Sequence, residues 1–99
     1  KTRNKTNYKL TKMTYQLNAD KILFTQLGEE GVVYDLEKNE YITLNETFFK
    51  IVQGIEQAKK QDEIVAALCD EYAIDAVTCE KEVGAAIDKL LAKEYILKA

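Results

Sequence analysis

Strand-type segments come first in this chain, and segments with helical periodicity follow them. Lys21–Leu27, Val32–Leu36 and Glu40–Leu44 are rich in β-branched, aromatic and other apolar residues, the types that fit a pleated, half-buried surface. Two glycines favour a turn at Gly28–Gly31, and the asparagine of Glu37–Asn39 favours another because it tolerates left-handed backbone. Short connections between successive strands predict an antiparallel meander in sequence order.

Three helices are predicted after the third strand. Asn45 is a good N-cap for the first, and apolar residues follow it at helical spacing: Phe48, Ile51, Val52 and Ile55. A polar break at Ala58–Gln61 separates it from a second helix, Asp62–Tyr72. Asp75 caps a third helix of about Ala76–Lys93, and Tyr95–Leu97 ends the chain as a short extended piece.

The third helix carries a broad apolar stripe. Its members cover a sector of ~140° at 100° per residue: Cys79, Val83, Ala86, Ile87, Leu90 and Leu91. Periodicity alone favours a stripe that lies wholly in the core. The alternative is that part of it stays open beside the sheet as the wall of a groove, because the stripe is wider than one helix–helix contact needs.

Composition narrows the class of function. The chain has 99 residues, 46% of them hydrophobic and 31% charged, as expected for one globular domain. It has no histidine, and Cys69 and Cys79 form no CxxC motif. With no glycine-rich phosphate loop either, we expect no enzymatic activity, no metal and no cofactor. No apolar run approaches the ~18 residues of a membrane span, no signal peptide is evident, and the two cysteines are interpreted as reduced thiols of a cytoplasmic protein.

Charge is distributed unevenly between a basic arm and an acidic body. The whole chain carries −3 and residues 1–12 carry +5, so residues 13–99 carry −8; the basic residues are Lys1, Arg3, Lys5, Lys9 and Lys12. Met13, the only methionine, begins a stretch that is typical of a native N-terminus. We therefore interpret residues 13–99 as one domain and residues 1–12 as a tag or a fused peptide, with a native extension as the alternative. Tyr8 and Leu10 are expected to lie against a sheet of the same or a neighbouring molecule, which allows a homodimer through arm exchange.

Three sequence segments resemble those of one family. Val32–Thr47 reads VVYDLEKNEYITLNET, Asp62–Asp75 reads DEIVAALCDEYAID, and Glu82–Ile96 reads EVGAAIDKLLAKEYI. In this order they resemble the PqqD-like family, the small peptide-recognition domains of ribosomal-peptide maturation systems, over residues 21–97. Two positions depart from the family pattern: Val52 stands where many relatives carry tryptophan, and Glu94 where glycine commonly precedes the terminal apolar pair.

The resemblance implies an α+β, winged-helix-like fold of three antiparallel strands followed by three helices. It also implies binding of the leader segment of a ribosomally synthesised precursor peptide, held as an added strand and presented to a modifying enzyme or a leader protease. The third strand is last in the meander, so its outer edge is free to recruit such a strand. The backbone ladder is expected from Glu40, Tyr41, Ile42, Thr43 and Leu44. The apolar wall is expected from Val83, Ile87, Leu90 and Leu91. Basic leader residues are expected to meet Glu80, Asp88 and Glu40.

Two other functions remain open from the sequence. A winged-helix DNA-binding regulator is the main alternative, although the sheet precedes the helices here, which is not the usual order. The acids on the exposed side of the third helix, Glu80, Glu82 and Asp88 beside Lys81, Lys89 and Lys93, also oppose DNA binding because they repel phosphate. The other alternative is a structural subunit that docks on an enzyme through the same strand edge.

Overall fold

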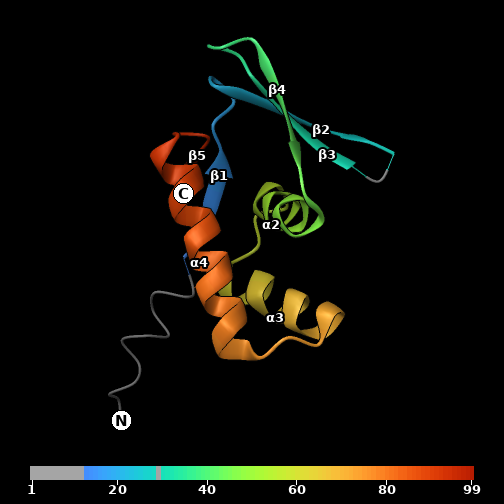
Figure 1. The fold of residues 1–99 in the computed structure, drawn as a ribbon. Coiled ribbons are helices and arrows are strands. Elements are labelled where there is room, and N and C mark those ends of the chain that lie inside the picture. Colours follow the sequence, from blue (N-terminus) through green and yellow to red (C-terminus); the bar gives the residue numbers. More distant parts are fainter. Residues whose placement is uncertain (1–12, 29) are drawn as a thin grey trace.

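The computed structural model describes residues 13–28 and 30–99, which form an α+β fold (Figure 1). The three-stranded meander followed by three helices is confirmed, and the topology is winged-helix-like. A second, two-stranded sheet joins segments from the two ends of the described chain. The predictions about residues 1–12, including arm exchange between two molecules, lie outside the described residues.

The larger sheet has the order β2-β3-β4 with antiparallel pairing throughout. Its strands are β2 (Ile22–Leu27), β3 (Glu30–Asp35) and β4 (Glu40–Leu44). Val33 lies opposite Phe24 on one side and Ile42 on the other. The sequence placed Gly31 in the first turn, but it lies inside β3. Glycine is needed at this position because the ring of Phe49 occupies the space that a side chain would take.

The three helices begin at the predicted caps or within a residue of them. They are α2 (Glu46–Glu56), α3 (Gln61–Tyr72) and α4 (Ala76–Ala92). The Asn45 side chain accepts a hydrogen bond from the Phe48 N–H at 2.8 Å, and Asp75 accepts one from the Thr78 N–H at 3.1 Å. Each bond satisfies a donor that the first helical turn leaves free.

The core lies between the sheet and the helices. Figure 1 shows α2 under the sheet, with α3 farther from it and α4 running from α3 up toward the C-terminal strand. Side chains from β3 and all three helices are almost completely buried in this core, among them Val33, Ile51, Ile55, Val83 and Ile87. Within the described residues, no helix is long and apolar enough to span a membrane.

The smaller sheet pairs β1 (Tyr15–Leu17) with β5 (Ile96–Lys98). The C-terminal extended piece agrees with the prediction. The sequence did not predict β1, because it has three residues and its strand partner β5 is some eighty positions away in the chain, so local pattern gives little signal.

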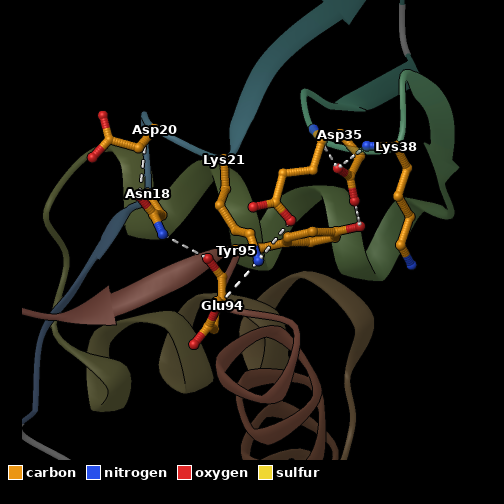
Figure 2. Close-up of polar contacts among 8 residues, drawn as sticks. Asn18, Asp20, Lys21, Asp35, Lys38, Glu94 and Tyr95 are labelled. Atoms are coloured by element: carbon orange, nitrogen blue, oxygen red, sulfur yellow. Dashed lines mark hydrogen bonds and ion pairs between the residues drawn. The ribbon is translucent and has the colours of Figure 1, made fainter.

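Glu94 adopts left-handed backbone, with φ of 62°, where α4 turns into β5. This conformation favours glycine, which accounts for the glycine expected here in the family pattern. Contacts offset the strain: the Glu94 carboxylate lies 3.1 Å from Lys21 Nζ, and its carbonyl accepts a hydrogen bond from Asn18 Nδ2 at 2.8 Å (Figure 2).

Candidate functional site

The outer edge of β4 is unpaired within the described part of the chain. On its inner side, β4 pairs with β3. Leu36 N–H donates to Lys21 O at 2.8 Å, so it points toward β2, and alternation along the strand turns the N–H of Val33 toward β4. Val33 and Ile42 therefore bond to each other, and the N–H and C=O groups of Tyr41 and Thr43 face outward.

A groove of about 260 Å³ lies between this edge and the C-terminal part of α4. We call it the β4–α4 groove; its lining residues are Val33, Ile42, Thr43, Leu44, Asn45, Phe48, Lys89, Leu90, Lys93 and Tyr95. Sites for whole small molecules usually enclose ~300–1,000 Å³, so this volume suits a few side chains better than a complete ligand. An apolar groove beside a free strand edge is the arrangement that binds an extended peptide.

The groove has an apolar floor and a basic rim. Val33, Leu90 and Tyr95 are buried beneath it, and Ile42 and Phe48 are half-buried on its sides. Lys89 and Lys93 line it as exposed residues of α4. Lys93 Nζ also lies 5.8 Å from the centre of the Tyr95 ring, a cation–π contact.

A buried carboxylate joins the two sides of the groove. Asp35, 3% exposed at the end of β3, accepts a hydrogen bond from the Tyr95 hydroxyl at 2.7 Å (Figure 2). Its other oxygen accepts from the N–H groups of Glu37 and Lys38 at 2.9 and 3.0 Å. The bond from the Lys38 N–H, then the Tyr95 bond and then the Glu37 N–H bond lower the pKa of Asp35, against a smaller opposing effect of burial. The hairpin that carries β4 is thus tied to the residue that follows α4.

Tyr95 is the neutral hydrogen-bond donor of this contact. Burial, and then the hydrogen bond to Asp35, raise the pKa of the Tyr95 hydroxyl to about 12. A tyrosine hydroxyl is already protonated at physiological pH at its ordinary pKa of about 10, so the shift only widens the pH range over which Tyr95 donates to the carboxylate.

The structure brings together only part of the predicted site. Ile42, Thr43, Leu44 and Leu90 line the groove. Glu40 and Tyr41 belong to the same strand, β4, with Tyr41 74% exposed on the outer face of the sheet. Whether these residues contact a peptide stays a prediction.

The predicted apolar wall needs correction. Val83 and Ile87 are 0% and 2% exposed, so they are core residues and do not line the groove. Leu91 is half-buried against the core and also lies outside the lining. The broad stripe of α4 is wide because the helix packs against α2, α3 and β5 together.

The predicted acidic contacts lie elsewhere. Glu80 lines a wider hollow beside α3, together with Asp62 and Asp70. Asp88 is exposed and is not among the residues that line the groove. Its charge contributes, after burial, to the raised pKa of Tyr15 in β1. Glu40 alone of the three stands near the groove, close enough to contribute to the raised pKa of Tyr95.

Sequence reasoning missed the rim and the support of the groove. Lys89 and Lys93 follow each other at i, i+4 and lie next to Leu90, so a helical wheel centred on Leu90 would have found them. Asp35 had a weaker signal: an aspartate just before a tight turn is a frequent acceptor for turn N–H groups. Its bond to Tyr95 joins residues sixty positions apart and left no local signal.

Comparisons with known proteins give a family match and similar folds. A family model described as "Coenzyme PQQ synthesis protein D (PqqD)" matches residues 30–96. Comparison with curated proteins gives no match.

Two solved structures are similar over most of the chain. One is described as "TbiB1 in Complex with the TbiA(beta) Leader Peptide"; it has a TM-score of 0.74 and 27% identity, and the match covers 82% of this chain and 93% of that one. The other, "Lasso peptide synthetase B1 complexed with the leader peptide", has a TM-score of 0.74 and 24% identity, with 84% and 96% covered. At that identity the second supports the fold alone.

Proposed function

The chain belongs to the PqqD family, and on this premise we propose that it binds the leader segment of a ribosomally synthesised precursor peptide. The leader adds a strand to the outer edge of β4 and lies beside α4. The similar TbiB1 structure is a complex with a leader peptide, which supports a peptide as the ligand. The role requires the cytoplasm, where such precursors are synthesised.

The observation that carries the proposal is the free edge of β4 beside an apolar groove. The outward N–H and C=O groups of Tyr41 and Thr43 form the ladder with the peptide backbone. These main-chain bonds are independent of peptide sequence, so they give affinity for extended segments in general.

Selectivity comes from the side chains that point into the groove. Side chains alternate along a strand, so every second residue of an added strand faces α4. Such a residue, if apolar, enters the space between Ile42, Phe48 and Leu90 and leaves water. The residues between them point away from the helix and do not enter the groove.

We propose that the chemistry on the precursor is performed by a partner, a peptide-modifying enzyme or a leader protease. Edge binding fits this division of work, because it holds a few leader residues and leaves the rest of the precursor peptide, on both sides of them, free for the partner. The domain is then a recognition module without a catalytic role, which brings the precursor to that partner.

Amide hydrogen exchange tests the strand addition residue by residue. The probes are overlapping synthetic peptides that cover short precursors encoded beside the gene, added to the full chain. We expect binding to slow the exchange of the Tyr41 and Thr43 amides, by about a hundredfold when free peptide is at 100 times Kd. The Ile42 amide is already bonded to β3, so any slowing there reports general stabilisation of the fold and not direct contact with the peptide.

Two outcomes would contradict the proposal. One is protection that maps to another part of the surface while Tyr41 and Thr43 exchange as before. The other is the absence of binding by every peptide of a precursor that the partner enzyme demonstrably modifies.

A further inference from the structure

The rim of the β4–α4 groove has the opposite charge to the chain as a whole. Formal net charge is −3, yet Lys89 and Lys93 line the groove. Within residues 13–28 and 30–99, neither forms an ion pair, whereas Lys21 pairs with Glu37 and Glu94, and Lys50 with Glu71. Two cations therefore border an apolar hollow without carboxylates to neutralise them.

The acidic groups nearest the groove leave this charge in place. Asp35 is buried and its oxygens accept bonds from Tyr95 and from the turn. Glu40, the first residue of β4, lies opposite Asp35 at the Tyr95 end of the groove, but within the described residues it forms no ion pair with Lys89 or Lys93. Glu80 lines the hollow beside α3. Asp88 is outside the groove lining and lies about 160° around the helix from Leu90, at 100° per residue.

The spacing of the two lysines suits an extended peptide. Lys89 and Lys93 are one turn apart, about 6 Å along the helix axis, with Leu90 between them. Residues two apart in a strand lie roughly 6.5 Å apart and point to the same face. The lysine spacing thus matches one step of two residues along the peptide. For a side chain that enters beside Leu90, the i−2 and i+2 neighbours are roughly 13 Å apart, so the long lysine side chains extend outward in opposite directions to reach them.

We infer that the leader recognised here is acidic around its apolar anchor: a leucine-like or aromatic residue enters the groove, with Asp or Glu two positions before it, after it, or both. This inference rests on the proposed function and specifies its ligand. It reverses the expectation that basic leader residues meet acids on the domain. Lys89 and Lys93 act as the specificity-determining residues.

Selection from a displayed library of random 15-residue peptides tests the inference. The full chain is compared with the double variant Lys89→Glu/Lys93→Glu. A matched double variant, Lys59→Glu/Lys81→Glu, changes the net charge equally at exposed positions outside the groove lining. Circular dichroism checks that all three are folded.

We expect the unaltered chain and the matched variant to enrich Asp and Glu at i±2 from an apolar residue. The Lys89→Glu/Lys93→Glu variant should enrich Lys and Arg at the same positions. In a selected peptide, each Glu→Gln change should weaken binding about fivefold or less, because the pairs are exposed, and the effect should shrink in 0.5 M salt.

The failures are distinguishable. Selected peptides without acidic enrichment, or with the same enrichment for both double variants, would overturn the charge selectivity and leave peptide binding in place. Failure to enrich any peptide on the unaltered chain would overturn the proposed function and this inference together.

Discussion

Asp35 is a buried acid whose two oxygens both have partners. One oxygen accepts from two backbone N–H groups of the turn and the other from the Tyr95 hydroxyl. The resemblance marked Asp35 only as part of a sequence motif. The structure gives it a physical role, because it fixes the hairpin that carries β4 against the end of α4.

Replacing Asp35 by asparagine should destabilise the domain in a pH-dependent way. The folded-state pKa is lowered, by the turn N–H groups first, so the carboxylate contributes stability above the unfolded pKa of about 3.9. The difference in unfolding free energy between the two proteins should be constant from pH 6 to 8. It should shrink as pH falls below about 4 and through the lower folded pKa, because the native carboxyl then also takes up a proton.

Urea unfolding at several pH values measures this difference. Asp70→Asn on the exposed face of α3 is the matched control, and it should leave stability nearly unchanged. A pH-independent loss in Asp35→Asn would show that the charge of Asp35 contributes nothing and that only its hydrogen-bonding shape matters.

At the scale of the element, β4 has two edges: one pairs with β3, and the other is the proposed site for the peptide. The groups of Ile42 bond to β3, whereas those of Tyr41 and Thr43 face outward. Neighbouring residues of one strand therefore have different functions.

Proline substitution separates these functions. Thr43→Pro removes an outward N–H and should abolish or strongly reduce peptide binding, with the domain still folded. Ile42→Pro removes a bond inside the sheet and should destabilise the domain by about 3 kcal/mol or more. Calorimetry with a bound leader peptide and urea unfolding measure the two effects. Equal stability losses in both variants would contradict the assignment of the N–H directions.

The sequence predicts most elements, but it does not predict features that depend on residues far away in the chain. The helices and β4 follow from caps and periodicity, as the Asn45 and Asp75 bonds illustrate. Gly31 was assigned to the turn because the reason for glycine there, the close approach of the Phe49 ring from α2, leaves no signal in the local sequence. β1 was missed for the same reason, since its strand partner is the end of the chain.

At the scale of the whole molecule, β1 and β5 bring the two ends of the described chain together. Ile96, 1% exposed, is part of the core and pairs opposite Leu17. The preceding residue, Tyr95, lines the groove. The closure of the chain and the shape of the groove therefore depend on the same short segment.

Truncation after Tyr95 should lower stability by several kcal/mol. It removes the buried Ile96, whose loss alone costs about 2–5 kcal/mol, and the whole partner of β1. For a domain stable by about 5–15 kcal/mol this is a large part of the total. Removal of Ala99 alone is the control and should have a small effect. An unchanged urea midpoint after the longer truncation would show that β5 is dispensable.

The sequence predicts the strand edge of the candidate site but not the composition of the groove. The free edge follows from strand order, because a meander leaves its last strand unpaired on one side. The composition of the groove does not, because it depends on how far α4 rotates about its axis when it packs. That rotation buries Val83 and Ile87 and turns Lys89 and Lys93 toward β4.

The vacant edge of β4 also couples ligand binding to melting. Only the folded domain offers this edge, so a peptide that pairs with it raises the melting temperature by mass action. At 100 times Kd the gain is about 2.7 kcal/mol, and each kcal/mol corresponds to about 4–8 °C in a domain of this length. Thermal denaturation with synthetic peptides can therefore rank candidate leaders before any partner enzyme has been purified.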